Sequence, residues 1–119
     1  GGGTTSASPT GGAALASKTV EAGAVTVKIE PLRIDGTGAE FKLTFDTHSV
    51  ELDFDVARNA SLTVAGTSWG GPVWSGDGPS GHHREGRVRF DAAGPATGSA
   101  VLALAGLPAP VTATWSLGA

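Results

Sequence analysis

The sequence predicts an all-β domain: an immunoglobulin-like antiparallel β-sandwich of about seven strands, with a small β-barrel as the alternative. From Lys18 onward, apolar residues recur at every second position, which is the period of a strand with one buried face. Gly, Pro and Asp separate the alternating segments, and these residues are typical of turns. No stretch combines a sustained helical period with capping residues. Short strands joined by turns therefore account for the pattern best.

The first half of the domain contains two clear alternating segments. Their inward sets are Val25, Val27 and Ile29, then Phe41, Leu43 and Phe45. Between them the apolar phase shifts by one residue at Pro31, which predicts a β-bulge or an edge position. Asp35-Gly36 followed by Gly38 predicts the turn of a hairpin.

A further alternating set predicts a strand over residues 50–56, with Val50, Leu52, Phe54 and Val56 inward. Inward positions are odd-numbered up to Phe45 and even-numbered from Val50, so we expect a kink near residues 47–49, where His48 lies. Shorter apolar sets predict the remaining strands, around residues 62–64, 88–90, 101–104 and 111–117.

Composition excludes several classes of protein. The formal net charge is −3 and no basic stripe is present, which argues against binding to nucleic acid or to an anionic membrane surface. Cys and Met are both absent, so disulfides, zinc ribbons, thiolate nucleophiles and blue-copper sites are excluded. No apolar run is long enough to span a membrane.

Residues 1–17 predict a flexible tether in front of a single domain formed by residues 18–119. The segment consists almost entirely of Gly, Ser, Thr, Ala and Pro, carries no charge and holds one large apolar residue, Leu15. Such a composition is typical of the spacer that follows the lipidated Cys of a bacterial lipoprotein. We therefore expect an extracytoplasmic location, in the periplasm or at the cell surface, with membrane attachment only through an N-terminal lipid anchor. A generic interdomain linker is the alternative.

Residues 66–86 predict a long, Gly-rich loop, and long ordered loops often carry function. This segment ends in Gly81-His82-His83-Arg84-Glu85-Gly86, and the predicted kink contains Thr47-His48-Ser49, followed by Leu52, Phe54 and Asp55. Together the two stretches resemble an uncharacterised group of exported prokaryotic β-sandwich domains of lipoprotein type, which carry THS-x-x-L-x-[FY]-D and GHHR-x-G motifs. The resemblance implies placement outside the cytoplasm and singles these residues out, but it implies no activity.

The imidazoles are candidate metal ligands. His48, His82 and His83 are the only histidines, and Asp46 lies near the first of them. Imidazole combined with carboxylate suits Zn²⁺ or Cu²⁺. The spacing matches no strong zinc motif, so the alternative is that the histidines bind loop backbone and brace the long connection.

The aromatic residues of the predicted loop are candidate contacts for a ligand or partner. Trp69 and Trp74 could form a platform for a sugar ring or a partner's side chain. Polar contacts would then come from Asp77, Arg84 and Glu85. The alternative is that both rings fold back and plug one open end of the domain.

These observations favour binding over catalysis. The leading prediction is an extracytoplasmic tethered binding domain that holds a transition metal through its histidines. The alternative is an accessory or structural subunit that docks on an envelope or membrane complex through the Trp-containing segment, and a metalloenzyme is the weakest alternative. Gly66–Gly70 matches G-x-S-x-G, but no helix follows as that nucleophile motif requires, so no catalytic residue is predicted.

Overall fold

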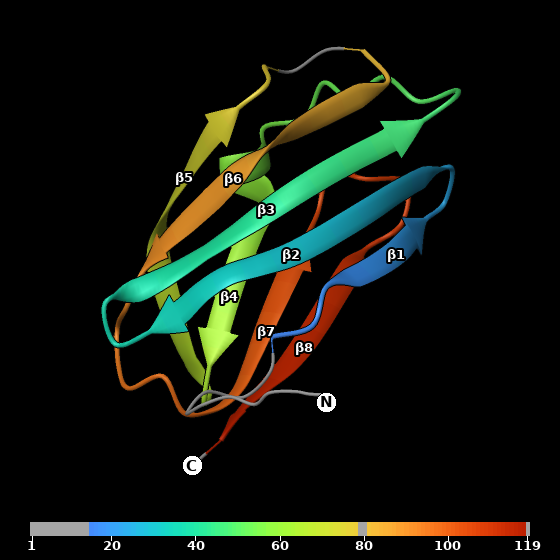
Figure 1. The fold of residues 1–119 in the computed structure, drawn as a ribbon. Helices are drawn as coiled ribbons and strands as arrows, with labels where there is room; N and C mark the ends of the chain where they lie inside the picture. Colours follow the sequence, from blue (N-terminus) through green and yellow to red (C-terminus); the bar gives the residue numbers. More distant parts are fainter. Residues whose placement is uncertain (1–14, 79–80, 119) are drawn as a thin grey trace.

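The computed structural model describes residues 15–78 and 81–118. Within them it contains eight strands and one short helix (Figure 1). The elements are β1 (Lys18–Ala22), β2 (Val25–Asp35), β3 (Gly38–Thr47), α1 (Val56–Asn59), β4 (Ala60–Val64), β5 (Thr67–Gly76), β6 (His83–Asp91), β7 (Gly98–Leu104) and β8 (Val111–Gly118). In this part of the chain no helix is long and apolar enough to cross a bilayer. The tether predicted for residues 1–17 lies mostly outside the described residues.

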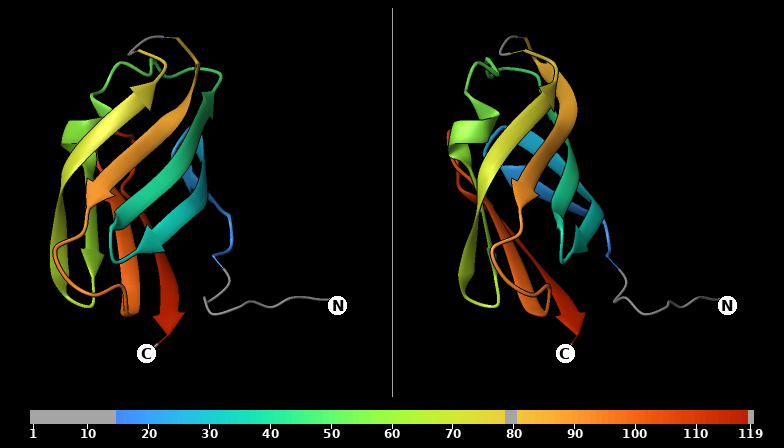
Figure 2. Two further views of the ribbon diagram at one scale, coloured as in Figure 1. Left: turned by 60° about the vertical axis from the view of Figure 1, so that its left-hand side comes forward. Right: turned by 90° about the vertical axis from the view of Figure 1, so that its left-hand side faces the viewer.

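All eight strands belong to one antiparallel sheet, in the order β1-β2-β3-β6-β5-β4-β7-β8. The sheet curls until its first and last strands lie side by side (Figures 1 and 2). At this seam the indole Nε1–H of Trp115 donates to the carbonyl of Ala16 at 2.7 Å, and the Lys18 ammonium lies 5.9 Å from the centre of the Trp115 ring. The all-β antiparallel prediction is confirmed, and the nearly closed sheet has the shape of the small barrel that was the alternative.

Strand β5 makes the sheet continuous by changing partners along its length. Its first residues pair with β4, with Trp69 opposite Leu62, and its later residues pair with β6, with Trp74 opposite Val88. The register shifts between Gly70 and Val73, which is the kind of irregularity that bends a sheet. The prediction of a loop over residues 66–86 is therefore wrong, because most of this segment forms β5 and β6. Its glycines and scarce apolar residues hid the strand period.

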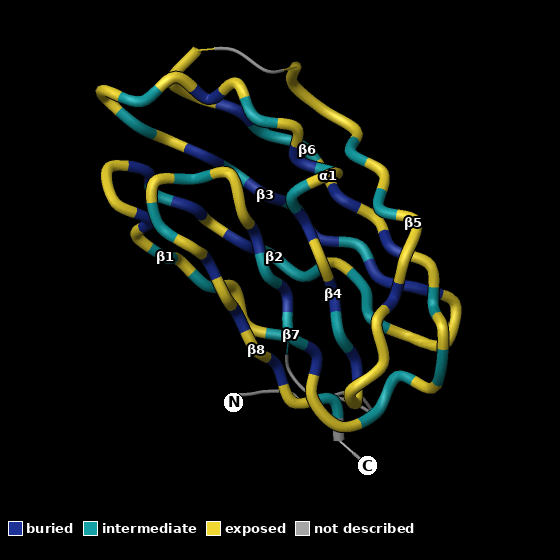
Figure 3. Tube along the Cα trace, turned by 180° about the vertical axis from the view of Figure 1, so that it is seen from behind, coloured by how far each residue is buried: buried dark blue, intermediate teal, exposed yellow. Residues whose placement is uncertain are grey.

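The core lies between the inward faces of these strands, and buried and exposed residues alternate along them (Figure 3). The inward sets predicted for residues 25–29 and 41–45 are fully buried. Phe41 is central, because its ring meets Phe90 edge-on at 6.2 Å and packs against Trp115 at 5.3 Å between ring centres. Burial of such rings supplies a large share of a small domain's hydrophobic stabilisation.

The prediction of a strand over residues 50–56 is also wrong. Residues 50–55 form a connection outside the sheet, and α1 follows at Val56. Asp55 caps the helix, since its side chain accepts a hydrogen bond from the Arg58 backbone N–H at 3.2 Å. Leu52 and Val56 are buried as the pattern suggested, but they pack on the core from a loop and a helical turn.

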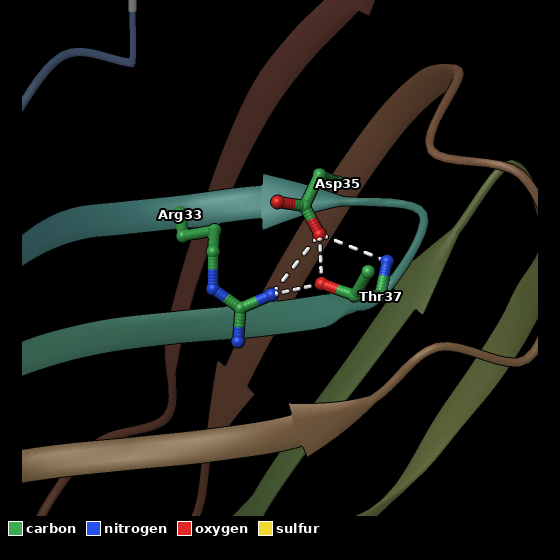
Figure 4. Close-up of polar contacts among 3 residues, drawn as sticks. All are labelled: Arg33, Asp35 and Thr37. Atoms are coloured by element: carbon green, nitrogen blue, oxygen red, sulfur yellow. Dashed lines mark hydrogen bonds and ion pairs between the residues drawn. The ribbon is translucent and has the colours of Figure 1, made fainter.

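The β2–β3 hairpin closes through a compact polar turn, as predicted (Figure 4). The Asp35 carboxylate accepts hydrogen bonds from the Thr37 hydroxyl and backbone N–H and from Arg33, at 2.5, 2.8 and 3.0 Å. These hydrogen bonds, those from Thr37 above all, lower the pKa of Asp35. The predicted bulge is confirmed by a register shift between Pro31 and Arg33.

The turn ends at a glycine whose replacement should be costly. Gly38 has a φ of +146°, and a Cβ built there would lie 2.5 Å from the Phe90 carbonyl oxygen. We expect Gly38→Ala to lower the free energy of unfolding by about 2–3 kcal/mol, measured by urea denaturation. Gly36→Ala is the matched control, because a Cβ there would meet no atom within 4 Å. Equal stability of the two variants would contradict this account of the turn.

Candidate functional site

The two segments singled out by sequence meet at one end of the barrel. Asp46 of β3 pairs with His83 of β6, and the Thr47 backbone N–H donates to the His82 carbonyl at 3.0 Å. Further along, the Leu52 N–H donates to the Gly81 carbonyl at 2.9 Å. All three histidines are thereby brought to the same end. We call the surface formed by Asp46, His48, His82 and His83 the histidine end.

Arg84 joins the two segments from inside. Its side chain is only 1% exposed, and its guanidinium donates to the carbonyls of Phe54, Asp77 and Leu52 at 2.7, 3.2 and 3.3 Å. It also lies 5.3 Å from the centre of the Phe54 ring and 5.6 Å from that of Trp74. Burial lowers the pKa of Arg84, and the charges of Asp77, Asp55 and Asp53 oppose this shift. Arg84, which the sequence suggested as a contact for a ligand, is therefore buried and holds the 50–55 connection in place.

The two candidate tryptophans are turned toward the interior. Trp69 is only 3% exposed. Trp74 is half-buried, packs on Phe45 at 6.3 Å between ring centres, and donates its Nε1–H to the Asp77 carbonyl at 2.9 Å. Gly86 makes room for this ring, since a Cβ there would lie 2.6 Å from the Trp74 Cζ2 atom. The rings therefore fill the barrel, as in the alternative interpretation, and do not form an exposed aromatic platform.

His83 is the histidine with defined side-chain contacts. It is 55% exposed, its Nδ1 lies 2.5 Å from the Asp46 carboxylate, and its Nε2 lies 3.7 Å from Glu85 Oε1. A carboxylate only accepts hydrogen bonds, so Nδ1 carries a proton and neutral His83 has its lone pair on Nε2. The hydrogen bond to Asp46, followed by the attraction of the Asp46, Glu85 and Asp77 charges, raises the pKa of His83.

His48 and His82 are exposed neighbours of this pair. Within residues 15–78 and 81–118, no three His, Asp or Glu side chains are grouped so that they could hold a metal ion. The structure therefore brings the four predicted ligands to one end of the barrel without arranging three of them around a common point.

Two hollows flank His83. The larger, about 500 Å³, lies on the outer face of β3, β6 and β5 and is lined by Lys42, Ser75, Asp77, Glu85, Gly86 and Arg87. The smaller, about 310 Å³, is lined by Ala24, Thr26, Asp46, Thr47 and His48. His83 contacts Asp46, which lines the smaller hollow, and Glu85, which lines the larger one, so His83 lies between the two hollows. We call the larger hollow the polar groove.

The polar groove contains two residues that the sequence singled out, Asp77 and Glu85, and three charged or hydroxyl residues that it did not. Lys42, Ser75 and Arg87 come from three different strands. The Lys42 ammonium lies 2.9 Å from Glu85 Oε2; this contact raises the pKa of Lys42 and lowers that of Glu85. The only sequence signal for Lys42, Ser75 and Arg87 was their outward position in an alternating strand. Outward positions usually hold solvated side chains, so this signal did not indicate a site.

No protein-family model, curated protein or solved structure matches this chain. The resemblance to exported prokaryotic β domains stays a prediction. The chemistry open to the site therefore has to be judged from its own groups: an oriented imidazole, two exposed carboxylates, two cations and a hydroxyl, all reachable from solvent. Such a set suits the binding of a small polar or ionic ligand.

Removing the internal brace should destabilise the whole domain. Arg84→Met leaves the carbonyls of Leu52, Phe54 and Asp77 without this donor, and we expect the free energy of unfolding to fall by about 3 kcal/mol. Arg89→Met, at an exposed outward position of the same strand, should cost less than about 1 kcal/mol. Urea denaturation followed by Trp fluorescence measures both. A stable Arg84→Met variant would show that the brace is not needed.

The hydrogen bond between Asp46 and His83 can be tested by titration. Asp46→Asn should lower the pKa of His83 toward its ordinary value of 6.5, because it removes the largest cause of the shift. In the wild type the pair stabilises the fold below the unfolded-state pKa, and this stabilisation is lost as pH rises through the higher folded-state pKa. Imidazole NMR signals followed against pH give both values. An unchanged His83 titration would contradict the hydrogen bond.

Proposed function

We propose that the protein is an extracytoplasmic, tethered binding domain whose ligand contacts the histidine end and the polar groove. The observation that carries this proposal is the setting of His83, which is held by Asp46 on one side and faces Glu85 beside a groove of about 500 Å³. The end of β5 and the start of β6 lie in the half of the barrel opposite to the first described residues of the chain (Figure 2). A domain tethered at its N-terminus would thus present this surface away from the tether.

A transition metal ion is the ligand that the histidine end favours. A metal-binding His commonly donates its other ring N–H to a carboxylate, which fixes the tautomer and orients the free nitrogen. His83 has this arrangement, with Asp46 at Nδ1 and Nε2 turned toward Glu85. In this proposal His83 and Glu85 are the first ligands of Zn²⁺ or Cu²⁺, and His48 and His82, exposed at the same end, would turn toward the ion to add further ligands, because no three of these described side chains are grouped in the structure.

Docking on an envelope or membrane complex is the weaker proposal. In this proposal Trp69 and Trp74 would contact the partner, but most of the surface of both side chains is buried inside the barrel and cannot form an interface. Aromatic residues contribute most to an interface when they enter a pocket of the partner, which these inward rings do not offer.

Metal binding can be measured directly on the full chain. We expect Zn²⁺ to perturb the NMR signals of His83 and Glu85 saturably at neutral pH, and His83→Ala to weaken binding about tenfold or more. Because protons compete for Nε2, the affinity should fall as pH drops through the pKa of His83, which lies above 6.5. His48→Ala and His82→Ala should have smaller effects.

Asp91→Asn, which replaces an exposed carboxylate at the far end of β6, is the control for lost charge and should bind Zn²⁺ like the wild type. If the wild type binds neither Zn²⁺ nor Cu²⁺, or if His83→Ala binds them as well as the wild type does, the metal proposal is wrong.

A further inference from the structure

The strand register places two cations and a hydroxyl in one row across the polar groove. Lys42 of β3 lies directly opposite Arg87 of β6, and Ser75 of β5 lies opposite Arg87 on its other side. All three line the groove. Like charges directly opposite each other destabilise a sheet, so this row is an unfavourable arrangement unless something compensates it.

The carboxylates that pair with these cations lie one row away, on opposite sides. Lys42 contacts Glu85, which faces Thr44 in the next row toward the histidine end. Arg87 contacts Glu40 at 3.5 Å, and Glu40 lies in the next row away from that end, facing Arg89. Within the described residues no ion pair joins both cations to one carboxylate, and the Arg87 side chain is 62% exposed.

The neighbouring row has the opposite character. Glu85 and Asp77 are held side by side, because the Glu85 N–H donates to the Asp77 carboxylate at 3.1 Å and the Asp77 N–H donates to the Glu85 carbonyl at 3.0 Å. The groove is thus cationic along one row and anionic along the next. Each cation already contacts one carboxylate, and an anionic group of a ligand would be best placed between Lys42 and Arg87, where it could contact both cations.

We propose that Lys42, Arg87 and Ser75 form a binding site for the oxyanion of a small ligand, a carboxylate or a phosphate. This inference rests on the proposed function, in which the polar groove is the ligand site. Arg87 offers a planar pair of N–H donors that matches two oxygens, Lys42 adds a point charge, and Ser75 donates its hydroxyl proton. A positive group on the same ligand would face Glu85 and Asp77.

The site is tested by titrating the full chain with sodium acetate and, separately, with inorganic phosphate, followed by NMR. Both anions should perturb the backbone signals of Ser75, Gly86 and Arg87 saturably, and the one that binds tighter identifies the chemical source of the oxyanion. Lys42→Met and Arg87→Met should each weaken binding about tenfold, the loss expected when one charged hydrogen bond is removed. Higher salt should weaken binding as well.

Controls separate a built site from general charge attraction. Lys28→Met removes an exposed cation from the same outer face, on β2, and should bind both anions like the wild type, while Lys42→Arg should restore most of what Lys42→Met loses. Equal weakening by Lys28→Met would overturn the site. If neither anion perturbs the groove while Zn²⁺ still binds at His83, the oxyanion site is wrong and the proposed function stands. If neither the anions nor Zn²⁺ binds, both are wrong.

Discussion

The guanidinium of Arg84 lies inside the barrel, where its charge is balanced by backbone carbonyls and two aromatic rings in place of water. A buried cation is costly unless its donors are satisfied; the carbonyls of Leu52, Phe54 and Asp77 accept from its Nη1 and Nη2 groups, while its Nε–H has no partner among the described residues. These hydrogen bonds hold the connection against the end of β5 and the start of β6. Arg84 thereby reinforces the contact between two segments about 30 residues apart in sequence, which the β3–β6 ladder and the Leu52–Gly81 backbone hydrogen bond also hold together.

Strand β6 ties the candidate site to the core through its alternation. Arg84 and Val88 face inward and contribute to the packing of the barrel, and a side chain at Gly86 would meet the Trp74 ring. Glu85 and Arg87, between them, face the polar groove. A change in the packing around Trp74 or Arg84 therefore shifts the backbone that carries the groove residues. The surface groups are carried by a strand that is paired on both sides, and sites built on such elements have better-defined geometry than sites on loops.

The sequence was informative where structure follows from local chemistry. The two-residue period, the bulge near Pro31 and the Asp35 turn were predicted because each depends on neighbouring residues. Closure into a barrel was given only as the alternative, since it depends on β5 exchanging partners between Gly70 and Val73, a non-local event. The histidines lie at one end of the barrel but do not surround a common point. The inward role of Arg84 and the row of Lys42, Arg87 and Ser75 arise from a register that no single segment encodes.

The seam between β1 and β8 has a mechanical consequence. Among the described residues these strands share no ladder of backbone pairs, and the Trp115 side chain bridges the seam by its contacts with Ala16, just before β1, and with Lys18, the first residue of β1. If tension reaches the domain through its N-terminus, that bridge and the five-residue ladder between β1 and β2 carry the load first. His83 lies on β6, beyond both β2 and β3 in the sheet order. Pulling can therefore peel the first strand while the opposite surface keeps its shape.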